Sequence, residues 1–187
     1  MVARSSLLWF PSVAAVVALP FYAAGPPAAR TGGFAETTCA ECHRGEALNT
    51  PGGSVSLDSL PRAGFEPGHS YELWVVVTKP GIGRAGFQLS VRTDEANGKD
   101  KQAGTLAPVD DRTQFAAKNF GPIQYLEHTG KGSALAAPDT GRWSFRWQAP
   151  KTPQPVVFHI AANAANDDNS ELGDFIYTRA VHVIPVP

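Results

Sequence analysis

Alternation of apolar and polar residues constrains the fold of this chain more than any other feature. In residues 142–148, Trp143, Phe145 and Trp147 fall on one side of an extended backbone, and the residues between them are polar. Because successive side chains of a β-strand point to opposite faces, this period of two predicts a strand with one buried face. Four further segments alternate in the same way or are rich in β-branched and aromatic residues: 71–78, 86–91, 156–162 and 175–184.

Turn-forming residues separate these segments. The stretches KPGIGR, ANGKD, APDTG and NDDNSELGD combine proline, glycine, asparagine and aspartate, which favour tight turns. The chain has 187 residues with 18 glycines and 16 prolines, and it has no helical period of useful length after residue 50. Several short strands at this spacing predict an all-β domain, an antiparallel β-sandwich of seven or eight strands over residues 55–187.

The first 29 residues predict export from the cytoplasm. A short basic start, MVAR, is followed by an uncharged and mostly apolar run that extends to Arg30. This pattern is typical of a secretory signal peptide, and the small residues Ala-Ala-Gly offer a cleavage site. The run is also long enough for an uncleaved hydrophobic helix that anchors the protein in the inner membrane through residues 5–24. Both alternatives place the rest of the chain in the periplasm or elsewhere outside the cytoplasm.

Residues 30–54 connect this leader to the sandwich and contain both cysteines. Residues 25–36 are rich in glycine, proline and alanine and predict a flexible linker. Thr38 and Glu41 have the spacing of a helix capping box, which predicts a helix of one or two turns that carries Cys42 and His43. The stretch NTPGG, residues 49–53, is expected to end it.

Cys39, Cys42 and His43 form a C-x-x-C-H motif, the arrangement required for covalent attachment of haem c. The two thiols bind the porphyrin, and the adjacent histidine is the proximal iron ligand. A Cys39–Cys42 disulfide is the main alternative in an oxidising compartment. A redox dithiol is expected between a strand and a helix, and a zinc site needs a second ligand pair, so both fit less well.

The sixth iron ligand is expected to be a histidine, because the only methionine is Met1 in the leader. His128 is the preferred candidate, since it ends a predicted strand, PIQYLEHT, beside a flexible loop. His69, His159 and His182 lie at the start of or inside predicted strands, where a structural role is the ordinary expectation.

The remaining sequence features favour a binding or carrier protein over an enzyme. The formal net charge is −1, so no basic field predicts a nucleic-acid partner. No hydrolase motif or glycine-rich phosphate loop appears. The acidic loop NAANDDNSELGD, residues 163–174, has oxygen ligands suited to calcium but not the EF-hand spacing, and a solvated hairpin loop is its ordinary interpretation.

Several phrases together resemble bacterial Reeler-like exported proteins of the choice-of-anchor V type. They are RTGGFAETTCAECHRG, GFQLSV, YLEHT, WSFRWQAP and NAANDDNSELGDFIYT, and the resemblance covers roughly residues 28–178. The resemblance implies an immunoglobulin-like β-sandwich preceded by a C-x-x-C-H segment. It also implies that His128, Trp143 and Pro150 correspond to residues of the family's sequence motifs. It informs the fold more than the activity.

The sequence thus predicts an exported, non-enzymatic protein with one covalent haem c that transfers single electrons. Cys39 and Cys42 would hold the haem, with His43 and His128 as iron ligands. Its partner would be a redox protein or a membrane electron-transfer complex. The alternative is a non-catalytic accessory subunit or adhesion domain of a membrane or cell-surface complex, in which Cys39 and Cys42 form a disulfide.

Overall fold

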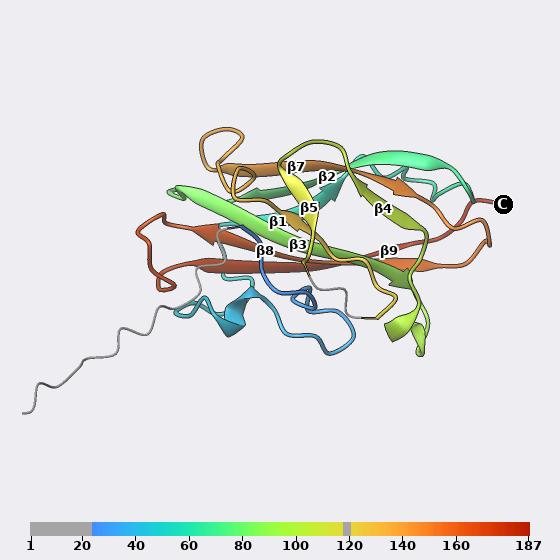
Figure 1. Cartoon of the computed structure of the whole chain (residues 1–187), viewed down its shortest axis with the longest axis horizontal. Coiled ribbons are helices and arrows are strands. Elements are labelled where there is room, and N and C mark those ends of the chain that lie inside the picture. The colour runs from blue at the N-terminus through green and yellow to red at the C-terminus, as the bar shows by residue number, and fades with distance from the viewer. Residues whose placement is uncertain (1–23, 118–120) are drawn as a thin grey trace, which may run out of the picture.

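The computed structural model describes residues 24–117 and 121–187, which form two antiparallel sheets. The first sheet has the order β1-β2-β7-β4, with β1 at Ser54–Asp58, β2 at Ser70–Thr78, β7 at Thr140–Gln148 and β4 at Thr105–Pro108. The second has the order β5-β6-β3-β8-β9, with β5 at Thr113–Phe115, β6 at Leu126–His128, β3 at Arg84–Thr93, β8 at Val156–Ala165 and β9 at Phe175–Val183. Figure 1 shows the sheets as two stacked layers. The predicted all-β sandwich is confirmed.

The hydrophobic core lies between the two sheets. In the pairing of β2 with β7, Val75 lies opposite Trp143, and both side chains are fully buried. The Trp143 ring contacts Phe87 of the opposite sheet with ring centroids 4.7 Å apart. Trp147 contacts Phe158, also of the opposite sheet, edge-to-face with ring centroids 5.0 Å apart. The predicted alternation therefore places the apolar residues of each strand on the face that meets the other sheet.

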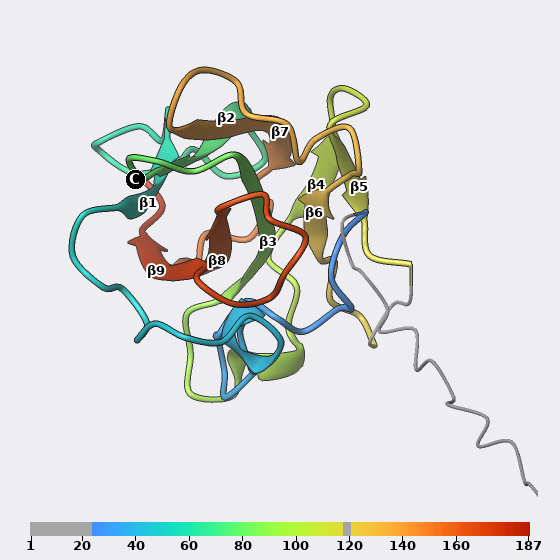
Figure 2. The ribbon, with the colours of Figure 1, turned by 90° about the vertical axis from the view of Figure 1, so that its left-hand side faces the viewer.

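Strand β3 departs from this pattern because it is buried on both faces. Its outward-facing side chains Gln88, Ser90 and Arg92 are polar, yet each is at most 1% exposed. They are covered by residues 24–53, which we call the N-terminal segment and which lie below the second sheet in Figures 1 and 2.

Three contacts attach the N-terminal segment to β3. The backbone N–H of Arg30 donates to Gln88 Oε1 at 2.7 Å, Thr31 Oγ1 lies 3.5 Å from Ser90 Oγ, and Glu36 pairs with Arg92. The predicted flexible linker at residues 25–36 is therefore packed on the sheet. Composition alone could not show this, because the partners of these residues lie more than 50 positions away.

The C-x-x-C-H motif is less helical than the capping-box spacing predicts. A single 3₁₀ turn, η1, covers Cys39–Glu41, and a second, η2, covers Gly98–Asp100. Thr38 caps η1 as predicted, because its side-chain oxygen accepts from the N–H of Ala40. Cys42 is the C-terminal cap and His43 lies beyond it. Glu41 pairs with Arg30 at 2.8 Å and accepts a hydrogen bond from Thr37 Oγ1. Its carboxylate therefore joins η1 to other residues of the N-terminal segment.

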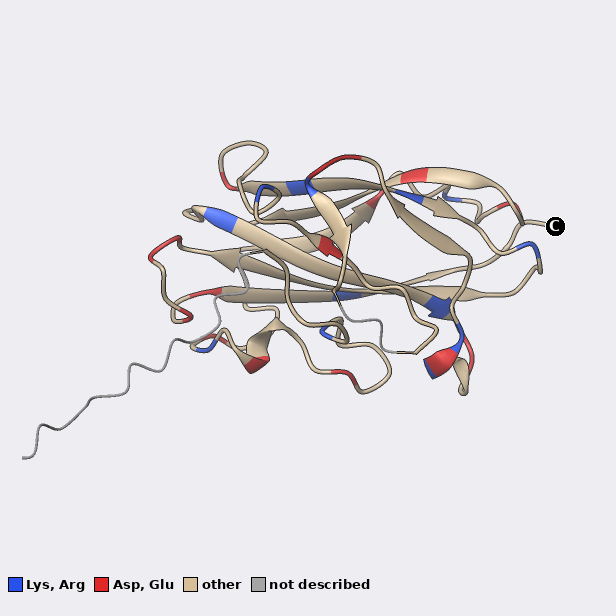
Figure 3. Cartoon of the chain, in the orientation of Figure 1, with Lys and Arg blue, Asp and Glu red and all other residues tan. Residues whose placement is uncertain are grey.

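The predicted N-terminal hydrophobic helix at residues 5–24 falls almost entirely outside the described residues. Within residues 24–117 and 121–187, no helix has the length and apolar character needed to cross a membrane. Acidic and basic residues are interspersed along the described ribbon (Figure 3), in keeping with the near-zero net charge.

Candidate functional site

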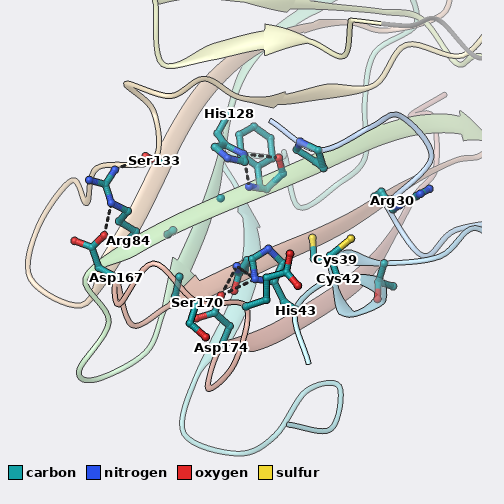
Figure 4. Close-up of a pocket in the computed structure, with 18 of the residues that line it drawn as sticks. Arg30, Cys39, Cys42, His43, Arg84, His128, Ser133, Asp167, Ser170 and Asp174 are labelled. Carbon is teal, nitrogen blue, oxygen red and sulfur yellow. Dashed lines mark hydrogen bonds and ion pairs between the residues drawn. The ribbon is translucent and has the colours of Figure 1, made fainter. Parts of the chain in front are cut away.

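A cavity of about 350 Å³ lies where the N-terminal segment meets one end of the second sheet. Its volume is in the range of small-molecule and cofactor sites. The lining comes from the C-x-x-C-H motif, the start of β3, His128 of β6, and the β8–β9 loop with Asn163 before it. Figure 4 shows His128 on one side of the cavity and His43 on the other, with both cysteine sulfur atoms beside His43. The fold thus brings all four predicted site residues to one cavity.

The two cysteines are half-buried and both thiols are free. Burial raises the pKa of the Cys39 thiol to about 12, with the neighbouring Cys42 as a smaller contribution in the same direction. Reactive redox cysteines have a lowered pKa, because the thiolate is the nucleophile. The raised pKa of Cys39 is the opposite of the shift found at a reactive redox cysteine.

His43 is held by a buried carboxylate. Its Nδ1 lies 2.6 Å from Oδ2 of Asp174, whose side chain is 1% exposed. Asn163 Nδ2 donates to the same carboxylate oxygen at 3.0 Å. Because a carboxylate only accepts hydrogen bonds, Nδ1 carries a proton, and in the neutral imidazole Nε2 then retains its lone pair. This is the arrangement of histidines that ligate metals through Nε2.

His128 lies on the opposite wall and is buried. Its Nδ1 is within hydrogen-bond distance of the backbone N and O of Phe87, at 3.1 and 3.2 Å. Burial lowers the pKa of His128 to about 4, although the hydrogen bond to the Phe87 backbone acts in the opposite direction. The imidazole is therefore neutral at neutral pH, the form in which histidine binds metals. Gly86 allows the ring to approach β3, because a Cβ there would lie 2.5 Å from His128 Cε1.

The other histidines have separate partners. His69 lies beside the ring of Tyr71 at 5.0 Å, and His182 pairs with Asp94 at 2.7 Å. His159 contacts Phe34 of the N-terminal segment edge-to-face at 5.3 Å. None of the three is among the described residues that line the cavity.

The acidic loop at residues 163–174 distributes its carboxylates among different partners. Asp167 pairs with Arg84, Asp168 accepts from the N–H of Ser170 at 2.8 Å, and Asp174 holds His43. Among the described residues, no group of three or more His, Cys, Asp or Glu side chains is arranged to hold a metal ion by itself.

Two residues of the site, Asp174 and Asn163, were not predicted. The polar residues of their loop suggested a calcium site from the sequence, but they did not predict that the loop contacts His43. No local signal relates the loop to His43, because Asp174 lies 131 positions further along the chain.

Glu127 is a second buried carboxylate near the site, and its ionisation is expected to affect stability. Its carboxylate accepts from two neutral amides, Gln88 Nε2 at 2.9 Å and Gln114 Nε2 at 3.4 Å. Burial raises its pKa from 4.5 to about 7. The native state therefore keeps a proton that the unfolded chain has already lost between these two pH values, and folding stability falls as the pH rises through this window.

We expect the free energy of unfolding to decrease by roughly 3 kcal/mol between pH 4.5 and 7, at about 1.4 kcal/mol per pH unit. Urea unfolding of the wild type and of Glu127→Gln at several pH values in this range measures the effect. Because the glutamine does not ionise, the variant is expected to lack this contribution. An equal pH dependence in both proteins would contradict the assignment.

Comparisons with known proteins give similarities of fold. No family model matches the chain, and no curated protein matches it. Among solved structures, a human F-spondin reeler domain is 20% identical, with a TM-score of 0.48 over 76% of this chain and 94% of that one. The Reelin-N domain of F-spondin is 20% identical, with a TM-score of 0.47 over 80% and 96%. A cohesin module from Clostridium perfringens is 13% identical, with a TM-score of 0.46 over 73% and 98%.

Proposed function

We propose that this protein carries one covalently attached haem c in the cavity and transfers single electrons outside the cytoplasm. One observation carries the proposal. His43 lies next to both thiols with Nδ1 held by buried Asp174 and Nε2 free, and a neutral buried His128 lines the opposite wall of the same cavity.

The residues of the cavity fit this cofactor. Cys39 and Cys42 are free thiols on one turn, which suits the formation of two thioether bonds to one porphyrin edge. His43 would be the proximal ligand and His128 the distal ligand. When bound, haem supplies a one-electron couple, and a pair of histidine ligands gives a lower potential than histidine with methionine.

The rest of the chain contributes binding and shielding. The second sheet and the N-terminal segment form two sides of the cavity. We place the protein in the periplasm or another extracytoplasmic compartment, where the hydrophobic leader would direct it. Its partner would be a redox protein or a membrane electron-transfer complex.

The decisive experiment is the intact mass of the native, membrane-extracted protein, read together with its absorption spectrum. We expect a mass increase of one haem and a sharp α-band after reduction. His43→Ala is expected to abolish the normal reduced spectrum, and replacing both cysteines by alanine is expected to abolish covalent attachment. His182→Ala is the matched control, because His182 pairs with Asp94 away from the cavity.

A different result would support the accessory-subunit alternative. A mass without haem, lowered by the two hydrogens lost on disulfide formation, with no visible band, would contradict the cytochrome proposal. The same mass would also show whether the first 29 residues remain on the protein.

A further inference from the structure

The carboxylate of Asp174, which contacts His43, is buried and is held in place by further hydrogen bonds. Asp174 is 2% exposed, and its two carboxylate oxygens have three donors. His43 Nδ1 and Asn163 Nδ2 donate to Oδ2, at 2.6 and 3.0 Å, and the backbone N–H of Asn166 donates to Oδ1 at 3.2 Å. A buried carboxylate is costly unless its lone pairs are satisfied in this way. The arrangement therefore holds a negative charge in a fixed position against one imidazole nitrogen.

The backbone fixes the same geometry. Asn163 belongs to β8, and Asp174 immediately precedes β9, so both lie at the hairpin end of the second sheet. The residue after His43 is attached to this hairpin as well, because the N–H of Arg44 donates to the carbonyl of Glu171 at 2.9 Å. The imidazole thus has little freedom to rotate away from Asp174, which lines the cavity beside it (Figure 4).

We infer that Asp174 is a positioning residue that fixes His43 as the Nδ1–H tautomer, keeps its Nε2 lone pair directed to the cavity, and favours the oxidised state of an iron bound there. The last part rests on the haem function proposed above. Asn163 Nδ2 can only donate, so it cannot bond to the protonated Nδ1 and instead orients the Asp174 carboxylate.

The effect on iron follows from the charge of the carboxylate. A carboxylate that accepts from Nδ1–H makes the imidazole a stronger electron donor at Nε2, and hydrogen-bonded partners of this kind are a general means of tuning a metal centre. Ferric iron carries one more positive charge than ferrous iron, so a stronger donor stabilises the ferric form more. Asp174 is therefore expected to lower the reduction potential of the site.

The tautomer is tested in the haem-free full chain by ¹⁵N NMR of the histidine side chains. We expect His43 of the wild type to be protonated on Nδ1 and unprotonated on Nε2. Asp174→Asn keeps an acceptor oxygen at the same place, so it is expected to keep this tautomer, whereas Asp174→Ala is expected to lose it. A wild-type His43 protonated on Nε2, or an Asp174→Ala tautomer equal to wild type, would overturn the inference.

The electronic effect is tested by redox titration of the haem-loaded full chain. Asp174→Asn removes the charge with little change of shape, and we expect the preference for ferric over ferrous iron to fall about tenfold or more. For a one-electron couple this is a rise in potential of about 59 mV or more. Asp168→Asn is the matched control, since it makes the same charge change in the same loop without a contact to His43.

The outcomes separate this inference from the proposed function. Equal potentials in wild type and Asp174→Asn, or an equal rise in Asp168→Asn, would overturn the assigned effect on iron while the protein remained a cytochrome. A chain that never acquires haem would overturn the proposed function and the effect on iron, and the NMR result on the tautomer would still stand. A purely structural role for Asp174 would change stability and leave the potential of the folded Asp174→Asn protein unchanged, which would also overturn the inference.

Discussion

Replacing Arg92 with alanine is expected to lower the free energy of unfolding by about 3–5 kcal/mol. The Arg92 side chain is 1% exposed, and its partner Glu36 is 8% exposed. Tyr125 joins the pair, because its hydroxyl donates to Glu36 Oε1 at 2.5 Å and accepts from Arg92 at 2.8 Å. Removing the guanidinium leaves the Glu36 carboxylate in a low-dielectric environment with two neutral donors, the hydroxyls of Tyr125 and Thr31, and no positive charge to offset its loss of solvation.

The loss is expected to act on the N-terminal segment, which carries the C-x-x-C-H motif. Phe34 also packs on the Arg92 guanidinium, with its ring centroid 5.0 Å away, so the truncation removes an aromatic contact as well. Urea unfolding gives the change in stability, and hydrogen exchange gives the local effect. Amides of residues 30–43 are expected to exchange faster in Arg92→Ala.

A matched control separates the buried pair from an ordinary surface pair. Arg84 pairs with Asp167 at the opposite end of β3, and both side chains are about half exposed, at 50% and 42%. Arg84→Ala is therefore expected to cost about 1 kcal/mol or less. Replacing Arg92 and Glu36 together with apolar residues of similar size is expected to recover most of the stability. Equal losses for Arg92→Ala and Arg84→Ala would contradict the assigned role of burial.

Trp147→Ala is the second large effect, with an expected loss of about 3–5 kcal/mol. The side chain is fully buried, and rings of Phe65, Tyr71 and Phe158 surround it with centroids 5.0–5.8 Å away. Its indole N–H donates to the carbonyl of Ala103 at 3.0 Å. The truncation would leave a cavity in the centre of the sandwich and a buried acceptor without its donor.

Trp74→Ala provides the comparison for the same chemical change on the outer face of β2. Trp74 is only partly buried and contacts the guanidinium of Arg142, which lies 3.9 Å from the ring centroid. We expect a loss of about 1 kcal/mol, since an exposed cation–π contact contributes little. Urea unfolding of both variants measures the difference. A cost for Trp74→Ala as large as that for Trp147→Ala would show that burial is not what makes Trp147 important.

The long strands could be predicted from sequence because their pattern is local. The segments around Trp143 and Val75 alternate over at least seven residues, and the structure contains them as β7 and β2. Strands β1, β4 and β5 have only three to five residues, too few for a period of two to stand out, and they lie at sheet edges. Their formation depends on pairing with longer neighbours.

The candidate site divides in the same way. Cys39, Cys42 and His43 are adjacent in the chain, so their chemistry can be identified from spacing alone. His128 could be proposed from its place at a strand end, and only the fold places it on the wall of the same cavity. The prediction of a flexible linker was wrong because a segment of small residues can still be ordered by polar partners such as Gln88 and Arg92, which lie far away in the sequence.

The sequence by itself determined the features that depend on neighbouring residues, namely the all-β pattern, the turns and the C-x-x-C-H motif. The tertiary structure alone decided which distant groups meet. It buried the polar face of β3 under the N-terminal segment, and it placed Asp174 against His43 although 131 positions separate them. The physical reason is that periodicity and turn chemistry are properties of a few consecutive residues, whereas burial and hydrogen-bond partners are set by how whole sheets and segments pack.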